Sequence, residues 1–81
     1  MIQESVTLTR DIGGRQAANF VYAVSQYPCN LWITKEGKRV NGKSILGLLS
    51  AKLMKDDAVI ISFDTDNCDI VNRIIGEINN K

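Results

Sequence analysis

Ser44 is the residue whose type and surroundings could do the most chemistry in this chain. It follows Lys43 and precedes an apolar run that includes Ile45, Leu46 and Leu49. A serine in this place commonly caps a helix, because its hydroxyl accepts a hydrogen bond from an early backbone N–H. The same hydroxyl beside clustered apolar side chains is also typical of a phosphorylation switch on a binding surface. The pattern alone leaves both roles open.

Other side chains offer little catalytic chemistry, because the chain contains no histidine. Without imidazole there is no Ser-His-Asp or Cys-His pair and no imidazole proton shuttle. Cys29 and Cys68 form no zinc-binding pattern, and we expect two free, mostly buried thiols, although the spacing leaves a disulfide open. The acidic residues at 56–57 and 64–66 are typical of turns and helix caps. We therefore expect no metal, no cofactor and no enzyme active site.

Two segments resemble phosphate-binding elements. Gly13, Gly14 and Arg15 precede a predicted helix, where backbone N–H groups and a guanidinium could hold an anion. An equally simple interpretation is a flexible loop with an exposed arginine. Residues 37–44 satisfy the P-loop pattern G-x-x-x-x-G-K-[ST], which makes a nucleotide-binding domain an alternative. A P-loop follows a buried strand of a parallel sheet, and the repeated βαβ units of such a sheet are missing here, so this alternative is the weakest.

Size and charge are those of one small globular domain covering residues 1–81. The net charge of +1 gives no reason to expect direct nucleic-acid binding. No apolar run approaches membrane-spanning length, and the first residues do not form a signal peptide. We therefore expect no membrane association and a cytoplasmic location.

Hydrophobic periodicity predicts seven elements in the order β-α-β-β-α-β-α. Strands are expected over residues 2–8, 31–34, 38–40 and 58–63. Helices are expected from Arg15 to about Tyr27, from Ser44 to near Met54, and after a cap at Thr65 or Asp66 to Ile78. The three helices are amphipathic, so they can cover one face of a four-stranded, antiparallel sheet. The predicted fold class is α+β.

The motifs on these elements resemble the HPr phosphocarriers of the bacterial phosphotransferase system. Residues 37–50 (GKRVNGKSILGLLS) are similar to the regulatory-serine region of HPr, and residues 15–21 (RQAANFV) are similar to the start of its active-site helix. The resemblance implies an open-faced β-sandwich and places Gly13 where the family has its phosphate-accepting histidine. Gln16 stands where the family has a helix-starting proline. A chain that keeps the serine and lacks the histidine resembles the catabolite-repression HPr-like (Crh) proteins.

This resemblance implies a non-enzymatic regulatory protein that is phosphorylated at Ser44. It implies an HPr kinase/phosphorylase and a catabolite-control transcription regulator as partners. It sends Leu48 to the core and assigns partner binding to a larger set: Gly14, Arg15, Lys43, Ile45, Leu46 and Leu49. The alternative within the family is a degenerate HPr that docks phosphotransferase enzymes without carrying phosphate.

Overall fold

The computed structural model describes residues 1–79 and contains the seven expected elements in the expected order. The strands are β1 (Ile2–Thr7), β2 (Leu31–Lys35), β3 (Lys38–Asn41) and β4 (Ala58–Phe63). The helices are α1 (Arg15–Val24), α2 (Ile45–Ala51) and α3 (Cys68–Ile78). The α+β class and the β-α-β-β-α-β-α order predicted from the sequence are therefore confirmed.

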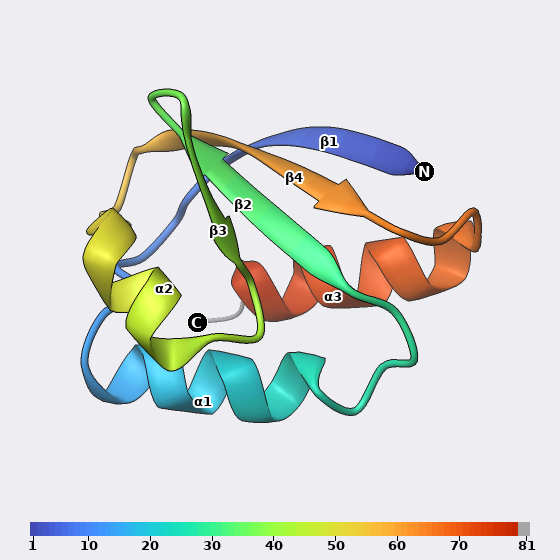
Figure 1. Cartoon of the computed structure of the whole chain (residues 1–81), viewed down its shortest axis with the longest axis horizontal. Coiled ribbons are helices and arrows are strands. Elements are labelled where there is room, and N and C mark those ends of the chain that lie inside the picture. The colour runs from blue at the N-terminus through green and yellow to red at the C-terminus, as the bar shows by residue number, and fades with distance from the viewer. Residues whose placement is uncertain (80–81) are drawn as a thin grey trace.

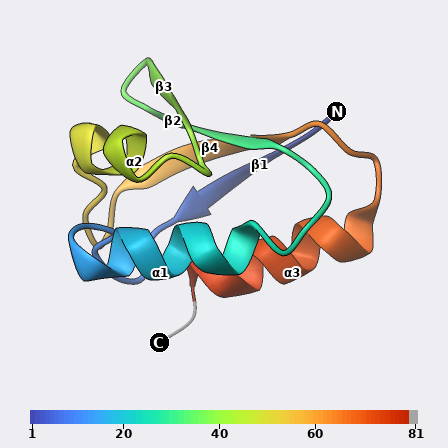
Figure 2. The ribbon, with the colours of Figure 1, turned by 60° about the horizontal axis from the view of Figure 1, so that its bottom comes forward.

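The four strands form one antiparallel sheet with the order β1-β4-β2-β3. Figures 1 and 2 show α1 and α3 side by side against one face of this sheet, with α2 beside β3 and the start of α1. The register places Ile33 of β2 opposite Ile61 of β4 and Val40 of β3. These inward side chains build the core with the apolar stripes of α1 and α3, because alternate residues of a strand share a face.

The apolar stripe of each long helix agrees with its sequence pattern. In α1 the buried residues are Ala17, Phe20 and Val24, and in α3 they are Val71, Ile74 and Ile78. No described helix has both the length and the apolar character needed to cross a bilayer.

The P-loop alternative is wrong for a structural reason. Residues 38–41 form β3, which pairs antiparallel with β2 across a turn at Glu36 and Gly37. Gly37 adopts a φ of 80°, which a hairpin turn requires and a side chain disfavours. The segment is therefore a hairpin strand and not a phosphate-wrapping loop.

Several predicted boundaries are wrong. Helix α1 ends at Val24, with turn residues before Pro28, and α2 ends at Ala51 well before Met54. The cap of α3 is Asn67, whose side chain accepts from the N–H groups of Asp69 and Ile70. Because Asx and Ser/Thr residues all cap helices, the run from 64 to 67 contained several equivalent candidates.

The two thiols also differ from the prediction that both are mostly buried. Cys29 is buried, whereas Cys68 is exposed on the first turn of α3. Burial raises the pKa of the Cys29 thiol; Asp64 adds to the rise and Lys43 opposes it. The structure records both cysteines as free.

Candidate functional site

Ser44 is the N-cap of α2. Its backbone is extended (φ −112°, ψ 116°), and its Oγ accepts a hydrogen bond from the N–H of Gly47 at 3.1 Å. The absence of a side chain at Gly47 is part of this arrangement, because a Cβ there would lie 3.3 Å from Ser44 Oγ. Ser44 therefore caps the helix, which is one of the two roles that the sequence left open. The residue is half-buried at the surface and does not belong to the core.

Gly42 fixes the path by which the chain leaves β3 and reaches Ser44. Its N–H donates to the carbonyl oxygen of Leu31 at 2.8 Å. A Cβ on Gly42 would lie 2.6 Å from Cγ of the fully buried Leu31, far inside normal contact distance. The second glycine of the P-loop-like pattern is thus required for packing.

The apolar residues of α2 divide into a buried and an exposed set. Leu48 is fully buried, while Leu46 is 80% exposed and Ile45 and Leu49 are 42% and 40% exposed. We call Ile45, Leu46 and Leu49 the apolar patch. Clustered exposed apolar side chains of this kind usually mark an interaction surface.

Lys43 forms two hydrogen bonds that the sequence did not predict. Its Nζ donates to the carbonyl oxygen of Tyr27 at 3.1 Å, and its backbone N–H donates to Asn41 Oδ1 at 2.8 Å. The lysine therefore fastens the start of α2 to the loop after α1. Its pairing with a partner's acidic group stays a prediction.

Gly13, Gly14 and Arg15 lie at the start of α1, and all but Gly13 are exposed. Gly14 is the N-cap with a φ of 55°, and no side chain of residues 1–79 caps the helix. The Gln16 N–H donates to the carbonyl oxygen of Gly13 at 3.1 Å, which closes the first turn. This positive φ accounts for a glycine at position 14, whereas position 13 has no such requirement.

A surface hollow of about 400 Å³ joins the start of α1 to the end of α2. Its lining consists of Asp11, Ile12, Gly13, Gln16, Leu49, Lys52, Leu53 and Met54. Gly13 and the apolar patch residue Leu49 thus line one hollow although they are far apart in the chain. No spacing pattern links residues 11–16 to residues 49–54, so the sequence could not have predicted this hollow.

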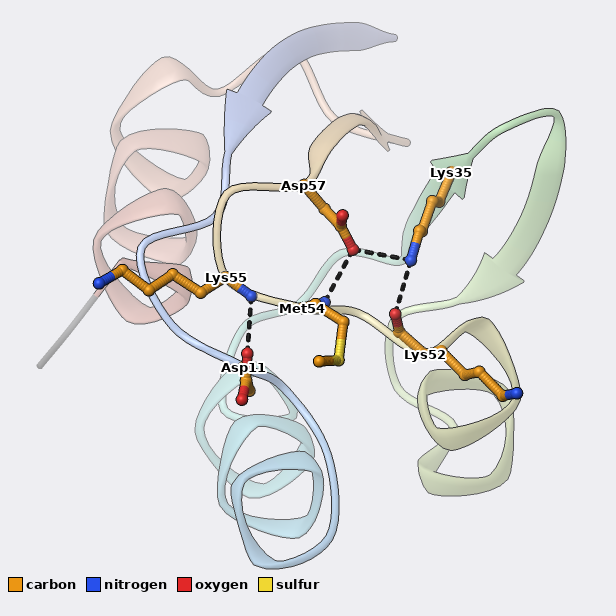
Figure 3. A network of polar contacts seen from close by, with 6 residues as sticks. All are labelled: Asp11, Lys35, Lys52, Met54, Lys55 and Asp57. Atoms are coloured by element: carbon orange, nitrogen blue, oxygen red, sulfur yellow. Dashed lines mark hydrogen bonds and ion pairs between the residues drawn. The ribbon is translucent and has the colours of Figure 1, made fainter.

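A polar network holds the turn that forms one wall of the hollow (Figure 3). The Lys35 Nζ donates to the Lys52 carbonyl oxygen at 2.6 Å and pairs with Asp57 Oδ2 at 2.7 Å. Asp57 Oδ2 also accepts from the Met54 N–H at 2.9 Å. The Lys35 hydrogen bond and the Met54 N–H lower the pKa of Asp57, so this carboxylate stays charged and in place at neutral pH.

Comparison with known proteins places these features in a family. Residues 2–79 match the family described as PTS HPr component phosphorylation site. The chain belongs to the HPr family. It is 34% identical to the phosphocarrier protein HPr of Neisseria meningitidis serogroup A over 71 residues, which cover 85% of this chain and 78% of that protein.

Two further comparisons point the same way. The HPr-like protein Crh of Halalkalibacterium halodurans is 42% identical over 48 residues, which cover 59% of this chain and 57% of that protein. The crystal structure of HPr from Bacillus anthracis str. Ames superposes with a TM-score of 0.84 at 25% identity, with 95% of both chains covered. The resemblance and the open-faced fold predicted from the sequence are therefore confirmed.

Membership in the HPr family sets the broad chemistry. HPr phosphocarriers are carriers and not catalysts, so the expectation of a non-enzymatic protein is confirmed. Proteins of this family interact with other proteins of the phosphotransferase system. Within residues 1–79 no three acidic or cysteine side chains are grouped to hold a metal ion.

Proposed function

We propose that this chain is a regulatory HPr-like adaptor that is switched by phosphorylation of Ser44. Its partners are an HPr kinase/phosphorylase, which adds the phosphate, and a transcription regulator of carbon catabolite control, which binds the modified form. The observation that carries the proposal is the position of Ser44 directly beside the apolar patch, whose three members are 40–80% exposed.

The proposal follows from what a phosphate would add at this place. Phosphorylation brings about −1.5 to −2 charges and three acceptor oxygens. An arginine of a partner can bind those oxygens bidentately, while Ile45, Leu46 and Leu49 supply apolar contact area. Similarity to a Crh protein supports this proposed regulatory role.

The lack of histidine argues against a role in phosphoryl relay. In our proposal Gly13 occupies the family's phosphate-accepting position, and glycine has no side chain that can accept the group. Arg15 and Gly14 then serve partner binding only. Phosphoenolpyruvate and the general phosphotransferase enzyme should leave no acid-labile phosphate on this chain.

Treatment with an HPr kinase/phosphorylase and ATP, followed by mass spectrometry, tests the switch. We expect one phosphate, on Ser44, and tighter binding of the regulator by the modified protein. Ser44→Ala should abolish labelling and leave the protein folded, with a loss of about 0.5–2 kcal/mol for the missing cap. The matched control is Ser50→Ala, since Ser50 lies on the same helix and its hydroxyl donates to the Gly47 carbonyl oxygen at 2.8 Å. Phosphate on another serine, or on none, contradicts the proposal.

A second candidate is a docking protein that binds phosphotransferase enzymes without carrying phosphate. The similarity to the Neisseria phosphocarrier over 85% of this chain favours it. This candidate predicts binding of the unmodified protein to those enzymes, and Ser44→Ala would leave that binding unchanged.

A further inference from the structure

Lys43 joins two segments that are far apart in the chain, and it is the direct neighbour of Ser44. Its Nζ donates to the carbonyl oxygen of Tyr27 at 3.1 Å, and this contact is partly buried. Its backbone N–H donates to Asn41 Oδ1 at 2.8 Å, which holds the residue in place before α2. The ammonium group therefore lies against the loop between α1 and β2, while its own backbone borders the proposed phosphorylation site.

The middle of that loop, residues 27–29, depends on this contact. One end of the loop continues from the last turn of α1, and at the other end the Asn30 N–H donates to Asp64 Oδ1 at 2.7 Å. Pro28, between these ends, has no N–H to donate. Among residues 1–79, the ammonium of Lys43 is the side-chain group that bonds to the backbone of residues 27–29. Removal of this group would leave the middle of the loop with fewer constraints than its ends.

Cys29 is the buried residue of this part of the loop. It is 5% exposed and belongs to the hydrophobic core. Burial raises the pKa of its thiol, Asp64 adds to the rise, and the nearby charge of Lys43 opposes it. The ammonium of Lys43 is therefore close enough to act on the thiol. A movement that takes Lys43 away from the loop affects the segment that covers Cys29.

A phosphate on Ser44 offers Lys43 a stronger partner than a carbonyl oxygen. The Ser44 Oγ that would carry the phosphate is held by the Gly47 N–H at 3.1 Å, one residue away from Lys43. Phosphorylation brings about −1.5 to −2 charges, so a bond from the ammonium gains the attraction of opposite charges. Within residues 1–79 Lys43 forms no ion pair that would compete. Its flexible four-carbon stem allows the ammonium to reach a group on the next residue.

We propose that phosphorylation of Ser44 draws the ammonium of Lys43 from the Tyr27 carbonyl oxygen to the phosphate, and thereby loosens the loop that covers Cys29. The proposal rests on the proposed function, because it describes what the Ser44 switch does inside this chain. The phosphoryl transfer is that of the switch, and the added step is an exchange of one hydrogen-bond acceptor for another. Phosphorylation then changes two regions of the molecule, the start of α2 and the loop between α1 and β2.

The reaction rate of the Cys29 thiol with an aromatic disulfide reagent measures the loosening. A Cys68→Ser background removes the exposed thiol, and chemical synthesis of the 81-residue chain installs phosphoserine at position 44 without a kinase. Cys29 of the phosphorylated chain should react at least about tenfold faster than Cys29 of the unmodified chain. This factor corresponds to about 1.4 kcal/mol, near the lower limit for a hydrogen bond to a charged group. An unchanged rate overturns the proposal.

Substitution of the lysine gives a second comparison that needs no phosphate. Lys43→Met should raise the Cys29 rate in the unmodified chain, because the loop loses the same hydrogen bond. Loss of the nearby positive charge by itself slows the thiol, since less thiolate forms, so a faster reaction reports exposure. The matched control is Lys38→Met, because Lys38 Nζ also donates to a backbone carbonyl oxygen at 3.1 Å, that of Ser50. Equal rises in the two variants overturn the proposal.

The effect of urea on the same rates distinguishes a local opening of the loop from unfolding of the whole domain. A local opening exposes little surface, so the Cys29 rate should change little at low urea concentrations. A steep rise with urea in the phosphorylated chain would assign the reaction to global unfolding and overturn the proposal.

Kinase labelling of the unsubstituted protein separates this proposal from the switch. Absence of phosphate on Ser44 after treatment with an HPr kinase/phosphorylase would refute the switch, while the synthetic phosphoprotein would still decide the release of Lys43. Phosphate on Ser44 together with an unchanged Cys29 rate would support the switch and overturn the release. Phosphate on Ser44 with a faster Cys29 reaction supports both.

Discussion

Gly42→Ala should destabilise this protein although it adds only a methyl group. The new Cβ would lie 2.6 Å from Cγ and 2.8 Å from Cδ1 of Leu31, about 1 Å closer than favourable carbon contacts. Leu31 is fully buried, and a side chain in a close-packed core can move only at the expense of its neighbours. Overpacking of this kind costs about 1–3 kcal/mol. A domain of this size loses about 4–8 °C in Tm per kcal/mol, so we expect Tm to fall by about 4–24 °C.

Thermal unfolding followed by circular dichroism measures this effect, with Gly13→Ala as the control. Position 13 has open space and an ordinary φ, so its alanine should be neutral or stabilising by up to about 1 kcal/mol, through the unfolded chain. If both variants have the same Tm as the unsubstituted protein, the close contact does not constrain the chain, and the reasoning about Gly42 is refuted. A fall in both variants would instead indicate a general intolerance of alanine for glycine.

Two further predictions concern α2 and the polar network. Leu48→Ala should cost about 2–5 kcal/mol because the side chain is fully buried, whereas Leu46→Ala should cost under about 0.6 kcal/mol because one fifth of its side chain is covered. Urea unfolding of the two variants decides this, and similar losses would contradict the division of the helix. The lowered pKa of Asp57 means that the unfolded state binds more protons between that pKa and the ordinary 3.8, so stability should fall as the pH falls through this window. In Asp57→Asn the decline, measured as urea midpoints at acidic pH, should be shallower, and an unchanged slope would count against the Lys35–Asp57 interaction.

The sequence predicted the order of the elements because α1, α3 and β4 have a clear hydrophobic period, while the turn at Glu36 and Gly37 indicated β3. The apolar stripe Val71, Ile74 and Ile78 and the alternating Val59, Ile61 and Phe63 allow one interpretation each. Helix ends were less predictable, because α2 stops at Ala51 where Lys52 takes a left-handed conformation with a φ of 51°. A lysine does not indicate a left-handed helix end, whereas a glycine at this position would have indicated one.

The candidate site was predictable in part. The motif around Ser44 located the start of α2, and the resemblance separated Leu48 from the exposed residues. The attachment of Lys43 to Tyr27 and the hollow between Gly13 and Leu49 depend on long-range packing. Such contacts join segments that have no shared periodicity, so they become visible only in the folded structure.

Helix α2 has seven residues, which is too few for a helix to persist alone in water. The hairpin supplies part of what it lacks, since Lys38 Nζ donates to the Ser50 carbonyl oxygen at 3.1 Å and Lys35 Nζ to that of Lys52. A nascent, cleaved or heat-denatured copy still has the sequence of the serine motif. Its α2 helix, however, unfolds when the hairpin unfolds. A protein that binds the apolar patch of the folded helix therefore distinguishes folded from unfolded copies as well as this sequence from others.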